Sequence, residues 1–112
     1  MTTEERIAKL EFQTELLFSN TECDRFIYES GITRTEYRGI MDLMDTYRSR
    51  IDRHEEVSSA EFESNIYEIV PSKYGDYHFC EGICKAFADN GSWREVFQAL
   101  YGNLPKYGGH IE

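Results

Sequence analysis

The sequence lacks any long hydrophobic run. No segment approaches the roughly 18 consecutive apolar residues of a membrane-spanning helix. The first residues, MTTEER, also lack the basic start and the apolar stretch of a secretory signal. We therefore expect a cytoplasmic protein that does not enter a membrane.

Basic residues are outnumbered by acidic ones. The chain carries 12 Lys and Arg against 21 Asp and Glu, which gives a formal net charge of -9. A field of this sign repels nucleic-acid backbones and anionic lipid headgroups, so the composition disfavours direct binding to either. The acidity has two interpretations: it keeps a small protein soluble, or it lets an acidic face bind a basic partner by mimicking DNA.

Cysteine is limited to three residues, an odd number that does not suggest a disulfide framework. His78, Cys80 and Cys84 come nearest to a metal site, because two thiolates four residues apart on a helix can share one face. Zinc would need further ligands, and the other Cys and His residues lie far away in the sequence. Cys80 and Cys84 also share a stripe with Phe87, and free Cys is most often buried. We therefore expect reduced core thiols and no bound metal.

Recognisable catalytic motifs and phosphate-binding loops are absent as well. Asp42, Asp45, Asp52 and Glu55 superficially resemble the carboxylates that hold magnesium in all-helical nucleotide hydrolases. They lie mainly opposite an apolar stripe and alternate with arginines, whereas metal sites in bundles use carboxylates that point inward. We expect no catalytic residue, no cofactor and no enzyme activity, and a small helical hydrolase is the least favoured function.

The sequence does contain a series of helix-start signals. Each has Ser or Thr followed three residues later by Glu, the pattern of a capping box that satisfies two otherwise unpaired N–H groups. They are Thr2-x-x-Glu5, Thr33-x-x-Glu36, Ser58-x-x-Glu61 and Ser92-x-x-Glu95. With 112 residues, 40% of them hydrophobic, the chain can bury one core. We predict an all-α fold, a small bundle of about five to six helices in one domain over residues 1–102, with a flexible tail over 103–112.

Apolar spacing places six helices along the chain. They cover about 3–18, 22–30 ending at Gly31, 34 to about 55, a segment from Ser58 to Pro71, one from a cap at Asp76 to Asn90, and one from Ser92 to Gly102. The third is the clearest, because Ile32 before the cap can pack on Tyr37 as a hydrophobic staple. Loss of the Thr33 cap is expected to destabilise the protein, and Arg34, outside the box, is expected to tolerate Ala.

Two sets of side chains are candidates for contacts with other molecules. One set is Ile7, Leu10, Leu17 and Phe18, a short seam on the first helix. We expect that this helix either joins the core of the monomer or pairs with its copy in another subunit. Tyr and Trp are enriched at binding sites but also border the cores of small helical proteins. The aromatic set is Tyr74, Tyr77, Trp93, Tyr101 and Tyr107.

Most of the chain resembles the YhaI-like family of uncharacterised Bacillus proteins. The resemblance covers the segments RIAKLEFQTELL, DRFIYESGITRTEYRGIMDLMD, FESNIYEIV and ICKAFADNGSWREVFQALYG. Its matching features are Ile7, Leu10 and Glu11, the turn Gly31-Ile32-Thr33 with Glu36, and Gly91 ahead of Glu95-Val96-Phe97. The tail after Gly102 departs from the family. The resemblance implies a self-associating, intertwined helical bundle and brings no known activity or site residues.

We therefore predict a protein that acts through protein contacts as a homo-oligomer, in the cytoplasm of a Bacillus-type bacterium or in a phage that infects one. Its candidate interface residues are Ile7, Leu10, Leu17, Phe18, Trp93 and Tyr101. The alternative is a phage-type inhibitor, a DNA-mimic-like decoy that binds a basic host protein.

Overall fold

The structure is a computed structural model that describes residues 2–103. This part of the chain contains α-helices, one short 3-10 turn and connecting loops. The elements are α1 (Thr3–Ser19), α2 (Glu22–Ser30), α3 (Arg34–Asp52), α4 (Ser59–Ile69), the turn η1 (Pro71–Lys73), α5 (Tyr77–Asp89) and α6 (Arg94–Tyr101). The predicted all-helical fold with six helices is confirmed. The predicted flexible tail lies outside the described residues, except for Asn103.

Reciprocal capping boxes start the first three helices. In each box a Thr hydroxyl accepts the N–H of the third helical residue, whose carboxylate accepts the Thr N–H. The pairs are Thr2 with Glu5, Thr21 with Asp24 and Thr33 with Glu36. The first and third were predicted, whereas the Thr21 box, with Asp in place of Glu, was not. Helix α2 ends at Gly31 with φ 75°, the left-handed conformation that the sequence predicted.

At α4 only half of the predicted box forms. The Ser58 hydroxyl accepts the N–H of Glu61 at 3.2 Å. The Glu61 carboxylate turns away and binds the Arg50 guanidinium at 3.0 Å instead. An ion pair between α3 and α4 has replaced the return bond of the box.

The predicted capping box at Ser92 is wrong. Gly91 has φ 91°, and the Ser92 N–H donates to the Phe87 carbonyl at 2.9 Å, so Ser92 completes the end of α5. Trp93 precedes α6 in the left-handed conformation, with φ 51° and no capping side chain. Helix α3 is also shorter than predicted. It stops at Asp52, because the chain turns at His54 with φ 61°.

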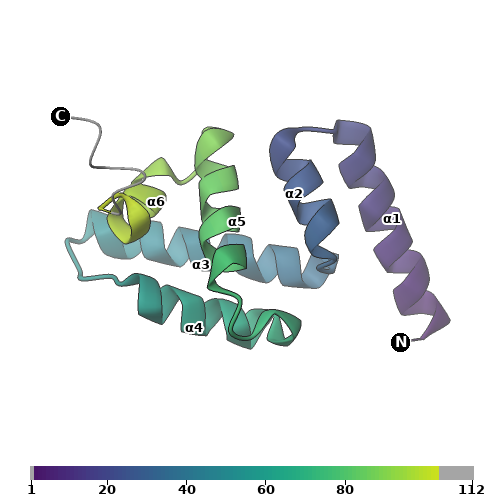
Figure 1. Cartoon of the computed structure of the whole chain (residues 1–112), viewed down its shortest axis with the longest axis horizontal. Coiled ribbons are helices and arrows are strands. Elements are labelled where there is room, and N and C mark those ends of the chain that lie inside the picture. The colour runs from purple at the N-terminus through teal and green to yellow at the C-terminus, as the bar shows by residue number, and fades with distance from the viewer. Residues whose placement is uncertain (1, 104–112) are drawn as a thin grey trace.

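The helices form an elongated body of 50 × 26 × 25 Å (Figure 1). Helices α1 and α2 form a hairpin at one end, and α3 runs from there along the long axis. Helix α4 returns beside α3, α5 crosses over α3, and α6 packs on α3 and α5 at the other end.

The core lies where α3, α4, α5 and α6 meet. Phe62 is fully buried, and its ring makes edge contacts with Tyr47 and Tyr101, with centroids 5.4 Å and 6.4 Å apart. The apolar stripes predicted for α3, α4 and α5 are confirmed as core faces, with Ile69 and part of the α3 stripe only partly buried. Their fully buried members include Ile40, Met44, Phe62, Ile66, Cys80, Ile83 and Cys84. Among residues 2–103, no helix combines the length and apolar character needed to cross a membrane.

Candidate functional site

Helix α1 has two apolar faces, and only one of them is covered. Phe12 and Leu16 are 3% and 6% exposed and pack against the rest of the molecule. The predicted seam of Ile7, Leu10, Leu17 and Phe18 lies on the opposite side, because each residue turns the helix by about 100°. These four side chains are 52% to 91% exposed. Helix α1 therefore joins the core of its own subunit through Phe12 and Leu16, whereas the predicted seam does not.

The buried face fixes α1 to the start of α3. Phe12 lies against Tyr37, with ring centroids 5.7 Å apart. The Arg34 guanidinium lies over the Phe12 ring at 5.1 Å and forms a salt bridge with Glu15. The hydrogen bond that the Arg34 guanidinium donates to the Glu15 carboxylate lowers the pKa of Glu15 below its usual value. Helix α1 is thus held in place while its other face points away from the subunit.

The exposed face is slightly hollowed over part of its length. A shallow depression on it is lined by Ile7, Leu10, Glu11, Thr14 and Glu15. Thr14 lies in the middle of this face, and its hydroxyl donates to the Leu10 carbonyl at 2.8 Å. Its polar group is therefore satisfied within the helix, so Thr14 does not interrupt the apolar face with an unpaired hydroxyl. The predicted seam included neither Thr14 nor the buried pair Phe12 and Leu16, although the four-residue spacing of that pair is the signal for a core face.

Trp93 and Tyr101 lie apart from this surface, so the six predicted interface residues do not share one face. Both lie at the α6 end of the molecule, far from α1 (Figure 1). Tyr101 is only 4% exposed, and its hydroxyl donates to the Glu63 carboxylate at 2.8 Å. Burial, followed by the nearby Glu63, raises the pKa of Tyr101. The Trp93 indole N–H donates to Asp45 at 2.9 Å, and its ring packs edge-on against Phe87.

Tyr74 and Tyr77, two further aromatics of the predicted set, lie around the start of α5. Tyr74 is exposed beside Tyr67, with ring centroids 5.5 Å apart, and Tyr77 is exposed beside His78. Tyr107 lies outside the described residues. The five aromatics considered from the sequence therefore do not form one binding surface.

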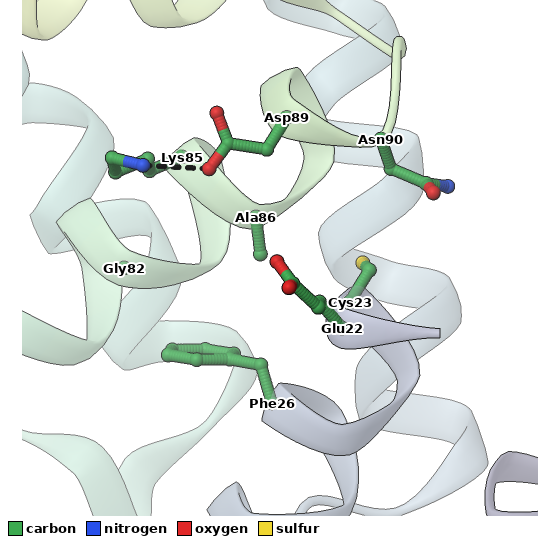
Figure 2. Close-up of a pocket in the computed structure, with 8 residues that line it drawn as sticks. All are labelled: Glu22, Cys23, Phe26, Gly82, Lys85, Ala86, Asp89 and Asn90. Atoms are coloured by element: carbon green, nitrogen blue, oxygen red, sulfur yellow. Dashed lines mark hydrogen bonds and ion pairs between the residues drawn. The ribbon is translucent and has the colours of Figure 1, made fainter. Parts of the chain in front are cut away.

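A groove of about 510 Å³ lies between α2 and α5, which are in contact along one side of it (Figure 2). Its lining residues are Glu22, Cys23, Phe26, Gly82, Lys85, Ala86, Asp89 and Asn90. The helices approach closely at Gly82, where an added Cβ would lie 2.8 Å from Cζ of Phe26. Lys85 and Asp89 pair with each other at 2.6 Å. Burial raises the pKa of Cys23 to about 11, so its thiol is protonated and weakly nucleophilic at neutral pH.

The thiols considered as metal ligands face the core. Cys80 and Cys84 are fully buried, and burial raises the pKa of each to about 12. His78 is exposed and lies beside the Tyr77 ring, with centroids 4.1 Å apart. Within the described residues, no group of three or more His, Cys, Asp or Glu side chains is placed to hold a metal ion.

The carboxylates of α3 face solvent, as their pattern predicted. Asp42, Asp45 and Asp52 are exposed, and Arg48 forms a salt bridge with Asp45 at 2.9 Å. Arg50 and Arg53 both bind Glu55 after the end of the helix. Asp45 has a further role that the sequence did not reveal, because it accepts the Trp93 indole N–H and ties α3 to the start of α6.

Comparisons with models of protein families, with curated proteins and with solved structures return no match for this chain. The YhaI-like resemblance therefore stays a prediction.

Proposed function

We propose that this protein acts through contacts with other proteins and that its first partner is a second copy of itself, bound through the exposed face of α1. The observation that carries the proposal is the exposure of Ile7, Leu10, Leu17 and Phe18 on one side of a firmly anchored helix. Contiguous apolar surface of this kind on a folded protein is typical of an interaction site. The YhaI-like resemblance supports the same direction, since it implies a self-associating bundle.

The size of this face suits a moderate affinity. Two copies would cover eight large apolar side chains, and each would contribute roughly 1–2 kcal/mol on being buried. This gain is offset by the freedom that two separate bodies lose when they bind. Association should therefore depend on protein concentration.

The alternative of an acidic decoy has less support. The exposed carboxylates of α3 alternate with arginines, and Arg48 binds Asp45, so this helix does not present a continuous acidic surface. A hydrolase has less support still, since the carboxylates first considered for magnesium lie on the solvent face.

Light scattering at tens of micromolar tests the proposal. We expect a mass above the 13.2 kDa of one chain, falling to that value in the double variant Leu10→Glu, Leu17→Glu. The matched control is Tyr74→Glu, Tyr77→Glu, which adds the same charge at exposed apolar positions outside α1. A monomeric wild-type protein, or equal dissociation by both double variants, would contradict the assignment of this face.

A further inference from the structure

We infer that two copies of α1 pair in parallel and in register, as a short two-stranded coiled coil. The inference rests on the proposed function and adds the orientation and register of the pair. In heptad terms, Ile7 and Thr14 occupy a positions and Leu10 and Leu17 occupy d positions. The flanking g positions are Arg6 and Gln13, and the flanking e positions are Glu11 and Phe18.

The seam has the side chains of a parallel pair. β-Branched residues at a and Leu at d favour two parallel strands, and Ile7 and Thr14 are the β-branched residues here. In a parallel pair each layer contains the same residue from both copies. Thr14 would then meet Thr14 of the partner subunit, with both hydroxyls already bonded to the Leu10 carbonyl of their own helix at 2.8 Å.

Charge complementarity favours the same orientation. In a parallel pair a g residue faces the e residue five positions further along the other helix, which brings Arg6 to Glu11 of the partner subunit. In an antiparallel pair, each a position of one helix faces a d position of the other. Glu11 would then lie beside Glu11 of the partner subunit. Arg6 and Glu11 are both exposed, and neither forms a salt bridge within residues 2–103.

The position of α1 allows this pairing without rearrangement. Its buried face, Phe12 and Leu16, points almost directly away from the seam, so the two bodies would lie on opposite sides of the helix pair. The helix is already formed and anchored by Arg34, so association does not have to order it. Helices α4 and α6 lie away from this end of the molecule (Figure 1).

Disulfide trapping of a Thr14→Cys variant tests the orientation. In the parallel pair the two new thiols share a layer, and mild oxidation should cross-link most of the protein. Wild-type protein is the control. Its own cysteines are at most 5% exposed and should give no cross-link.

A mixture of Ile7→Cys and Leu17→Cys chains, one of them carrying a tag, tests for the antiparallel orientation. A parallel pair gives only tagged–tagged and untagged–untagged cross-links, whereas an antiparallel pair joins tagged to untagged chains. Mixed cross-links without a Thr14→Cys cross-link would overturn the inference but leave self-association through α1 standing. Dimers that no α1 cysteine traps would overturn both the orientation and the assigned face, and a monomeric wild-type protein would remove the proposed function itself.

Charge exchange tests the register. Arg6→Glu should weaken the dimer several-fold, although an acidic residue near the start of α1 suits the helix dipole and should not destabilise the monomer. The double variant Arg6→Glu, Glu11→Arg restores opposite charges across the pair and should recover most of the affinity. Within one helix these residues are five apart and on different sides, so recovery would report a contact between copies. Absence of recovery, with a correctly folded monomer, would contradict the register.

Discussion

At the scale of single residues, the cysteines show how burial decides chemistry. All three thiols are free and buried, and burial raises the pKa of Cys80 and Cys84 to about 12 from a usual value of 9.0. A thiol that stays protonated at neutral pH is a poor nucleophile and a poor metal ligand. The physical role of Cys80 and Cys84 is to fill space in the core beside α4 and α6.

This burial predicts a loss of stability at alkaline pH. Cys80 and Cys84 lose protons near pH 9 in the unfolded chain but only near pH 12 in the folded one. Their folded pKa is raised, so the unfolded state releases protons first and stability falls as the pH rises above about 9. Urea unfolding at pH 7 and about pH 10 should show a lower midpoint at the higher pH.

The control is Cys84→Ala, which should unfold more easily at both pH values but lose less stability between them. In wild-type protein, a thiol reagent should react only as the chain unfolds. An unchanged pH dependence in Cys84→Ala, or fast labelling of the native protein, would show that burial of Cys84 is not the cause.

At the scale of helices, the start of α3 is specified by local contacts. The Thr33 hydroxyl accepts the Glu36 N–H at 3.1 Å, and the Glu36 carboxylate accepts the Thr33 N–H at 2.9 Å. Ile32, the predicted staple, is buried just ahead of the cap. Replacing Arg34 by Ala should cost more stability than the sequence suggested, because Arg34 binds Glu15 and covers the Phe12 ring on α1.

We predict that Thr33→Ala lowers the free energy of unfolding by about 1 kcal/mol, the usual cost of a lost N-cap. The suitable control is Thr35→Ala, an exposed residue in the first turn outside the box, which should change stability by less than about 0.5 kcal/mol. Urea unfolding measures both. Equal effects at the two positions would mean that the cap contributes nothing to this helix.

At the scale of the whole molecule, net charge opposes the association that the α1 face favours. Two copies each carry -9, so bringing them together raises their mutual repulsion. The apolar seam needs no counter-charge, and only the Arg6 and Glu11 pairs would attract through charge.

We therefore predict that the dimer dissociation constant falls when salt is raised from about 0.01 M to about 0.1 M, because the Debye length shrinks from about 30 Å to about 10 Å. Analytical ultracentrifugation at several concentrations measures it. A double variant that removes two negative charges, Asp42→Asn with Asp52→Asn at exposed positions of α3, should show a weaker salt dependence. A dissociation constant that rises with salt would mean that ion pairs outweigh both the apolar seam and the net repulsion.

Local patterns in the sequence determined the helical fold, most of the helix ends and the core faces of α3, α4 and α5. Capping boxes and apolar spacing act within a few residues, so they can be read without knowing what lies nearby. The left-handed start of α6 at Trp93 could not be read this way. There Trp93 packs on Phe87 and donates to Asp45, which is 48 residues away along the chain.

Tertiary structure alone decided which apolar face of α1 is covered. The sequence offers Phe12 with Leu16 on one side and the seam of Ile7, Leu10, Leu17 and Phe18 on the other, and both satisfy helical spacing. The choice follows from how α2 and the start of α3 pack on α1 and from Arg34, which ties Glu15 and the Phe12 ring to α3. This packing left the seam in solvent, because a helix in a small bundle can turn only one face to its own core. At the other end of the molecule, contacts with Phe62 and Glu63 of α4 buried Tyr101.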